Sequence, residues 1–284
     1  MSEIWRSVAI RSIALVVFLS FSFAASAQSV ATPNFFDQRP RTTRPVAPEL
    51  TRVRFLTSVD YPPFNFLDPR GRLAGFNVEL ARAICAELDI LNICQIEAMP
   101  FEDLMPALLR GDGDAVIAGV AVTAESREQL VFTDSYFRYP ARFVAPSAAS
   151  LDGVLAEGLR ETRIGVVEGT AHQAMLRSFF PLATAVSFPA REAMLEAVKA
   201  GDVAAAFGDG VGLSFWLSSE AAAGCCAFAG GPYFSDQFLG EGLAIALRAE
   251  NAGLAEAFDD AIARIVQERR FSELLLRSFP ISAF

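Results

Sequence analysis

The sequence predicts an α/β fold in which largely parallel β-sheets are covered by helices. Short apolar runs bounded by turn residues alternate with segments whose apolar residues recur at helical spacing. This alternation occurs twice along the chain, first from residue 53 and again from residue 142. The 284 residues suffice for one large or two small domains beyond a short leader.

The first half of the chain reads as strand and helix in strict alternation. Strands are predicted at 53–57, 92–98 and 115–122, and a helix at 101–109. The stripe of an amphipathic helix lies at Phe76, Leu80, Ile84 and Leu88. Gly119 interrupts the third strand, where the missing side chain allows close approach of a backbone or ligand. Thr123 then caps a predicted short helix.

The second half repeats this pattern. Strands are predicted at 142–146, 163–167, 185–188, 203–207, 225–228 and 242–247. Helices are predicted at 151–159, 171–179, 191–200, 254–267 and 271–278, and one more begins at Asp209. Thr170 is placed to cap the helix at 171–179. Ligands of such sheets bind where strands end and helices begin.

The N-terminus predicts export. Residues 1–27 combine a basic start, an apolar run and a small-residue cleavage site, as a secretory signal peptide does. A retained membrane anchor is the alternative interpretation. Residues 28–50 are rich in Pro, Thr, Ser and Arg and predict a disordered leader. The mature protein is therefore expected to be soluble and exported.

Charge and composition argue for binding of a small solute over catalysis. The net charge of −9 disfavours nucleic acid and anionic membranes as partners. His172 is the only histidine and there is no Cys-x-x-Cys, so no metal site and no cofactor are expected. No serine, histidine and aspartate order or phosphate-binding glycine loop is evident, so no catalytic residue is assigned.

The four cysteines fall into two close pairs. Cys85 and Cys94 lie towards the end of a predicted helix and in the next strand, and an exported protein favours a disulfide between them. Two buried free thiols are the alternative. Cys225 and Cys226 are adjacent, and we expect small core residues rather than a bonded vicinal pair.

Several motifs in order resemble one family. They are Thr57-Ser-Val-Asp-Tyr-Pro-Pro-Phe64, Gly75-Phe-Asn-Val-Glu-Leu-Ala81, Phe101-Glu-Asp-Leu-Met-Pro-Ala-Leu108, Phe132-Thr-Asp-Ser-Tyr136, Gly165-Val-Val-Glu-Gly-Thr170, Ala204-Ala-Ala-Phe-Gly-Asp209 and Gly240-Glu-Gly-Leu-Ala-Ile-Ala246. Together they span residues 53–280 and resemble the family 3 extracellular solute-binding proteins, the polar amino acid receptors of ABC importers.

The resemblance implies two α/β lobes of the type II periplasmic-binding-protein fold, with parallel-rich sheets, joined by a two-strand hinge. Lobe 1 would be 51–138 plus 237–284, and lobe 2 would be 139–236. A small polar, amino acid-like ligand would be clasped between them and favour the closed form. The inner-membrane ABC permease would read that form, and the receptor would be a periplasmic monomer.

The resemblance also implies ligand contacts. Tyr61 falls on an aromatic position that packs on the ligand, with Phe101 as its partner across the pocket. Asp209 falls on the acid that receives the α-ammonium group. Gly119 offers a backbone carbonyl, and Thr123 and Thr170 lie at the helix starts that face the ligand.

This chain departs from the family at other contacts. Ala121 replaces a hydroxyl residue, and Ser58 replaces a common acidic residue. The helix-start Arg that binds the α-carboxylate would stand at Ser126, and Arg127 follows one residue later. One residue turns a helical side chain by about 100°, so Arg127 either reaches the ligand or is a surface residue.

Two other functions are compatible with this pattern. One is an exported cyclohexadienyl or arogenate dehydratase-like enzyme on the same scaffold, with Glu168 and His172 as an acid/base pair. The other is a non-transport binding partner of a periplasmic dehydrogenase or sensor.

Overall fold

The structure is a computed structural model that describes residues 51–147, 151 and 159–282. The predicted signal peptide at 1–27, the leader at 28–50 and most of the predicted helix at 151–159 lie outside the described residues. Within the described residues, no helix combines the length and hydrophobicity that crossing a membrane requires.

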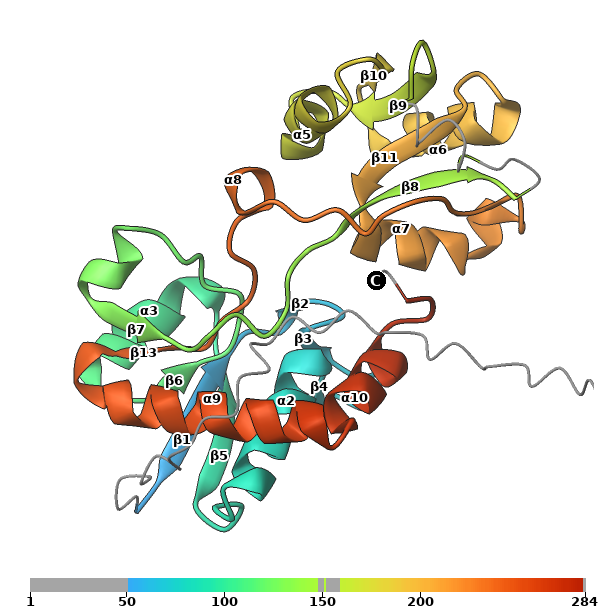
Figure 1. The fold of residues 1–284 in the computed structure, drawn as a ribbon. Coiled ribbons are helices and arrows are strands. Elements are labelled where there is room, and N and C mark those ends of the chain that lie inside the picture. Colours follow the sequence, from blue (N-terminus) through green and yellow to red (C-terminus); the bar gives the residue numbers. More distant parts are fainter. Residues whose placement is uncertain (1–50, 148–150, 152–158, 283–284) are drawn as a thin grey trace, which may run out of the picture. The chain divides into compact units, whose positions relative to one another are not determined.

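The first five-stranded sheet has the order β5-β1-β6-β13-β7 (Figure 1). Its strands are β1 (Val53–Thr57), β5 (Cys94–Ala98), β6 (Ala115–Val116), β7 (Leu130–Phe132) and β13 (Ala246–Arg248). β1 pairs in parallel with β5 and β6, whereas β13 runs antiparallel to β6 and β7. The parallel centre agrees with the alternating strand–helix pattern of this part of the chain.

Helices cover both faces of this sheet. They are α2 (Phe76–Glu87), α3 (Phe101–Arg110), α9 (Ala252–Gln267) and α10 (Arg270–Ser278). Phe55 in β1 packs with α2 and α9, and its ring stacks on Phe258 with centroids 5.1 Å apart. The next residue, Leu56, packs on the opposite face with Leu104 and Leu108 of α3. Phe55 and Leu56 are both fully buried, so β1 is covered by helices on both of its faces.

The second five-stranded sheet repeats the plan, with the order β10-β9-β11-β8-β12. Its strands are β8 (Ala141–Pro146), β9 (Arg163–Val167), β10 (Thr184–Phe188), β11 (Ala205–Asp209) and β12 (Cys226–Phe228). Three strands, β10, β9 and β11, are parallel, and β8 is antiparallel to β11 and β12. One face packs on α5 (Ala171–Phe179), and the other on α6 (Arg191–Ala200) and α7 (Gly210–Leu217).

Two segments connect the sheets and pair with each other. Phe137 forms an antiparallel bridge with Leu243, and Ala141 forms one with Tyr233. The chain thus leaves one sheet and returns to it along two adjacent antiparallel segments, as a two-strand hinge requires. The short helix α8 (Asp236–Leu239) lies on the returning segment, where Phe238 contacts Phe179 of α5 at 6.2 Å between ring centroids.

Several elements differ from prediction. The strand expected at 115–122 is only Ala115–Val116, because Gly119 takes a φ of 78° and ends the extended backbone. The helix expected after Thr123 is a single 3-10 turn, Ser126–Glu128. The three-stranded sheet β2 (Asp60–Tyr61), β3 (Asn65–Leu67) and β4 (Leu73–Ala74) was not predicted, and two further 3-10 turns lie at Glu220–Ala222 and Ala249–Asn251.

Both cysteine pairs are bonded. Cys85 in α2 is bonded to Cys94 in β5, which joins a helix to the edge strand of the first sheet. Cys225 and Cys226 are bonded to each other and are only half-buried. The expectation of two small core residues there is therefore wrong.

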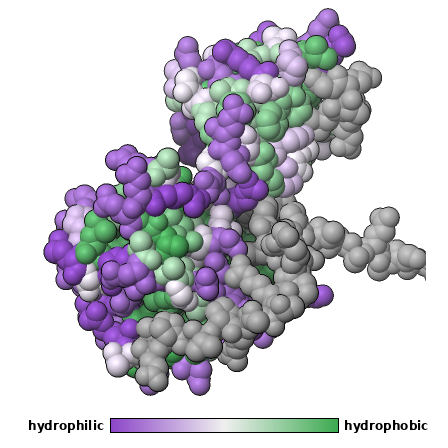
Figure 2. Space-filling view, turned by 60° about the vertical axis from the view of Figure 1, so that its left-hand side comes forward, coloured by the Kyte–Doolittle hydropathy of each residue, from purple (hydrophilic) through white to green (hydrophobic). Residues whose placement is uncertain are grey.

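The surface mixes residue types. Figure 2 shows hydrophilic residues over much of the face it presents, with smaller hydrophobic groups between them. Phe101 and Phe179 are among the large apolar side chains that remain exposed, at 45% and 41%. Scattered exposure of this kind is ordinary for a protein surface.

Candidate functional site

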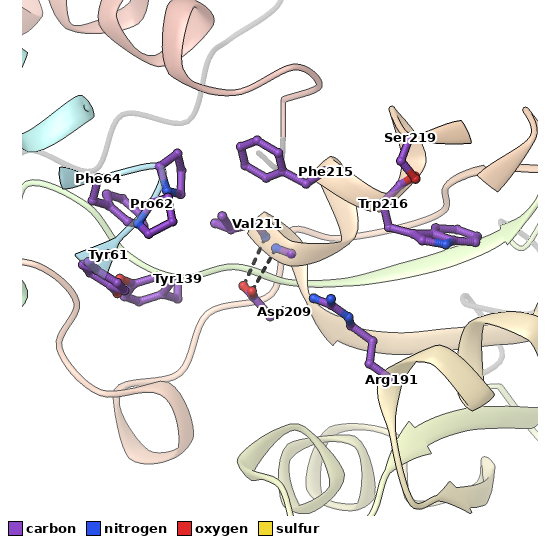
Figure 3. Close-up of a pocket in the computed structure, with 12 residues that line it drawn as sticks. Tyr61, Pro62, Phe64, Tyr139, Arg191, Asp209, Val211, Phe215, Trp216 and Ser219 are labelled. Carbon is purple, nitrogen blue, oxygen red and sulfur yellow. Dashed lines mark hydrogen bonds between the residues drawn. The ribbon is translucent and has the colours of Figure 1, made fainter. Parts of the chain in front are cut away.

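A cavity of about 520 Å³ lies beside the carboxyl end of β11 (Figure 3). Its lining residues are Tyr61, Pro62, Pro63, Phe64, Tyr139, Arg191, Asp209, Val211, Gly212, Phe215, Trp216 and Ser219. They come from the end of β2 and the loop after it, the first connecting segment, the start of α6, the end of β11, and α7 with the turn after it. A lining of mostly apolar and aromatic side chains with two charged groups, Arg191 and Asp209, is typical of a small-molecule site.

Asp209 ends β11 and begins α7. Its carboxylate accepts hydrogen bonds from the backbone N–H of Val211 at 3.1 Å and of Gly212 at 2.9 Å, as Figure 3 shows. These bonds satisfy two of the unpaired donors at the helix start. The backbone of α7 therefore gives this carboxylate two hydrogen-bond donors. Each oxygen still has a lone pair for a ligand.

Two tyrosine hydroxyls meet at the edge of the cavity. The Tyr61 and Tyr139 hydroxyls are hydrogen-bonded to each other. Burial raises the pKa of Tyr61, the bond to Tyr139 lowers it, and the negative charge of Asp209 raises it further. Burial raises the pKa of Tyr139 strongly, with Tyr61 and Asp209 adding to the effect. Both tyrosines are therefore neutral hydrogen-bonding groups, and the negative charge of Asp209 contributes to their raised pKa values.

Gly119 supports the ring of Tyr61. A Cβ on Gly119 would lie 3.0 Å from Cε1 of Tyr61 and 3.4 Å from Leu243, and its φ of 78° favours glycine. The close approach expected at Gly119 is thus made by the Tyr61 ring. This contact lets the backbone that follows β6 hold the Tyr61 ring beside the cavity.

His172 lies near Asp209 but is not among the residues that line the cavity. Burial lowers the pKa of its imidazole, and the negative charge of Asp209 opposes that shift. Its ring is 6.3 Å from that of Phe207, between centroids. The lowered pKa keeps the imidazole mostly neutral at pH 7.

Arg191 is a lining residue that the sequence analysis missed. It is the first residue of α6, directly after the turn that follows β10. The rule that ligands bind where parallel strands end and helices begin could have found it. Nothing in its local sequence marks it, because exposed arginines are common at helix surfaces.

Of the nine predicted ligand residues, the cavity brings together Tyr61 and Asp209. Ser58 is 1% exposed and belongs to a buried polar network instead. Its hydroxyl accepts from Asn65 at 2.8 Å, Asn65 accepts from Asn77, and Asn77 accepts from the hydroxyl of Tyr136. This network fixes the strand and loop that carry Tyr61.

The predicted contacts between Ala121 and Arg127 form a turn of their own. The backbone N–H of Thr123 donates to the Ser126 hydroxyl at 2.9 Å, and the N–H of Ser126 donates to the Thr123 hydroxyl at 3.1 Å. Ser126 also donates to the carbonyl of Ala121 at 3.0 Å. Arg127 is half exposed and forms an ion pair with Glu241 at 2.6 Å. Ser126 therefore locks the turn here.

The two remaining predicted contacts also lie outside the cavity lining. Phe101 begins α3 and is 45% exposed. Thr170 caps α5, because its hydroxyl accepts from the N–H of Gln173 at 3.3 Å and donates to the carbonyl of Val167 at 2.8 Å. Among the residues that the structure describes, no group of three or more His, Cys, Asp or Glu side chains could hold a metal ion.

Comparisons with known proteins identify the family. Residues 53–280 match the model of the bacterial extracellular solute-binding proteins, family 3. The chain is 31% identical over 235 residues to the L-arginine-binding protein of Pseudomonas aeruginosa, covering 82% of this chain and 89% of that protein. It is 29% identical over 229 residues to the ABC transporter arginine-binding protein 1 of Escherichia coli, covering 81% of this chain and 91% of that protein. Both are named for binding.

Solved structures share the fold. Substrate-binding domain 2 of Lactococcus lactis GlnP, in an open conformation, is similar with a TM-score of 0.65 and 16% identity, over 83% of this chain and 98% of that one. A substrate-binding domain from Streptococcus pneumoniae gives a TM-score of 0.65 at 21% identity, over 80% and 99%. The chain therefore belongs to family 3 of the bacterial extracellular solute-binding proteins and has their two-lobe α/β fold, with parallel-rich sheets joined by a two-strand hinge.

Proposed function

We propose that this protein is the periplasmic receptor of an ABC importer and that it binds an amino acid at Asp209. The carrying observation is the Asp209 carboxylate, which is fixed at the start of α7 beside the hydroxyls and rings of Tyr61 and Tyr139. Relatives named for arginine, for lysine, arginine and ornithine, and for histidine support an amino acid with a basic side chain.

The chemistry of the cavity suits such a ligand. The α-ammonium group would donate to the free lone pairs of the Asp209 carboxylate. The Tyr61 ring would contact the side chain, and a basic side chain over the ring would gain about 0.5–2 kcal/mol. Preorganisation by the α7 N–H groups and by Gly119 means that neither group needs to move far to bind.

The finer assignments follow from this proposal. The predicted signal peptide at 1–27 would direct export, and the mature protein would work as a monomer that delivers ligand to the inner-membrane permease. Of the nine ligand residues that the family resemblance predicts, the proposal uses Tyr61 and Asp209, which line the cavity. The other seven, which stay predictions from the resemblance and do not line the cavity, are Ser58, Phe101, Gly119, Ala121, Thr123, Arg127 and Thr170.

Calorimetry with the purified mature protein tests the proposal. The panel should include L-arginine, L-lysine, L-ornithine, L-histidine and L-glutamine. At least one should bind the wild type, and Asp209→Asn should weaken it. Loss of one charge from a buried ion pair costs about 2–5 kcal/mol, or about 30-fold or more in affinity. Asparagine caps helices as well as aspartate, so the variant should fold.

Asp202→Asn provides the matched control. Asp202 is exposed and precedes β11 at the end opposite Asp209. Its neutralisation should leave affinity unchanged. Absence of binding by every amino acid at millimolar concentration, or equal affinity in wild type and Asp209→Asn, would contradict the proposal.

A further inference from the structure

A cationic side chain lines the cavity, and it comes from a different part of the chain than the arginine that binds the α-carboxylate in the family. Of the described residues that line it, Arg191 is the one with a cationic side chain. The residue expected to do this work, Arg127, is 51% exposed and paired with Glu241 at 2.6 Å, and it does not line the cavity. Ser126 stands where the family has its carboxylate-binding arginine, and here its hydroxyl stabilises the turn by bonding to Thr123 and Ala121.

Arg191 and Asp209 flank the same small residue. A Cβ on Gly212 would lie 3.0 Å from Nη1 of Arg191 and also 3.0 Å from Oδ2 of Asp209. Both charged groups therefore lie against the face of α7 where Gly212 has no side chain. Figure 3 shows the Arg191 side chain extending towards this part of the helix. The pair presents one positive and one negative group to the same space.

The setting of Arg191 is unfavourable for stability, which points to a role in binding. It is the first residue of α6, where the partial positive charge of the helix start disfavours a cation. Its ion pair with Glu192 is 3.4 Å long, and the two side chains are 54% and 75% exposed, so that pair contributes little. The guanidinium is thus held weakly and can change partners.

We propose that Arg191 binds the α-carboxylate of the ligand while Asp209 binds its α-ammonium group. This inference rests on the proposed function and deepens it, because it makes the ligand an α-amino acid rather than an amine. An α-amino acid carries both charges on one carbon, which matches two opposite charges on either side of Gly212. Guanidinium groups bind carboxylates through two parallel hydrogen bonds.

The test compares amino acids with their decarboxylated amines. Calorimetry would use L-arginine with agmatine, L-lysine with cadaverine, and L-histidine with histamine, on the wild type, Arg191→Gln and Arg191→Lys. The wild type should prefer the amino acid. Arg191→Gln should weaken the amino acid about tenfold or more and change the amine less than about threefold, so that the preference is lost. Arg191→Lys should keep part of the preference, since it keeps the charge but not the paired bonds.

Arg127→Gln is the matched control, because it removes the same group at the position that the family resemblance indicates. It should leave the preference intact. The inference is overturned if Arg191→Gln leaves the preference unchanged, if it weakens acid and amine equally, or if Arg127→Gln alone abolishes the preference. Absence of binding of any amino acid to the wild type is a different result. It would remove the proposed function itself, and this inference with it.

Discussion

At the scale of single residues, Asp209 combines a structural and a binding role without conflict. Its two oxygens accept from Val211 and Gly212. A carboxylate can accept about four hydrogen bonds, so two sites remain for a ligand. The backbone donors fix the direction of the remaining lone pairs. The same residue is therefore oriented before any ligand arrives.

His172 predicts how stability depends on pH. Burial lowers the pKa of His172 below its usual 6.5. Below that pH the unfolded imidazole binds a proton that the folded one does not, so the free energy of unfolding falls as the pH is lowered. Because His172 is the only histidine, no other imidazole contributes. His172→Gln should show a smaller drop in Tm between about pH 7.5 and 5.5 than the wild type, by calorimetry. Identical pH profiles would show that the imidazole is not buried.

The family resemblance predicted Tyr61 and Asp209, whereas only the general rule on where ligands bind in parallel sheets points to Arg191. Tyr61 lies in an aromatic loop and Asp209 ends an apolar strand before a helix, and both stand in motifs that resemble the family. Arg191 reaches the cavity only because α6 and α7 pack on the same face of the second sheet. That proximity depends on tertiary packing, which no local motif encodes.

At the scale of elements, Glu87 ties three helices together. It ends α2 and accepts from Arg264 of α9 at 2.6 Å and from Arg270 of α10 at 2.9 Å. Burial raises the pKa of Glu87, but the bonds from Arg264 and Arg270 outweigh it, and the pKa is lowered overall. Its contribution to stability is therefore complete above its usual pKa of 4.5 and is lost as the pH falls through the lower, folded value.

Glu87→Gln should lower the free energy of unfolding by about 1.5–3 kcal/mol at pH 7, the usual worth of hydrogen bonds to a charged group. Urea denaturation would measure the difference. Glu256→Gln is a suitable comparison, because Glu256 is an exposed residue of α9. If the two variants are equally stable, the bonds of Glu87 to Arg264 and Arg270 add no more to the free energy of unfolding than an exposed surface charge does.

Helices were easier to predict than strands. The helices predicted at 171–179 and 191–200 match the observed bounds of α5 and α6. The strand at 115–122 was overestimated, since an apolar run continues past the point where Gly119 ends the extended backbone. The short α8 was missed because four residues show no periodicity.

At the scale of the whole molecule, the two sheets share one plan. In each sheet three neighbouring strands are parallel, the fourth runs antiparallel to them, and the fifth is antiparallel to the fourth. Each sheet is also packed on both faces. The repeated pattern of strand and helix was readable from the sequence, and the order of motifs indicated the family. The antiparallel strands were harder to predict. β13, for example, pairs with β6 and β7 only because the chain returns to the first sheet after forming the second.

Ligand binding should stabilise both sheets together. Tyr61 follows β1 of the first sheet, and Asp209 ends β11 of the second, so a ligand that contacts both links two cores. At 100 times its Kd, a ligand adds about 2.7 kcal/mol to stability, which corresponds to about 100-fold slower exchange of amides that open globally. Hydrogen exchange followed by mass spectrometry should therefore show added protection in peptides that contain β1 and in those that contain β11. Asp209→Asn at the same ligand concentration should show little added protection in either. Protection confined to one sheet in the wild type would mean that the ligand binds one lobe alone. It would then not contact both Tyr61 and Asp209, and the prediction would be wrong.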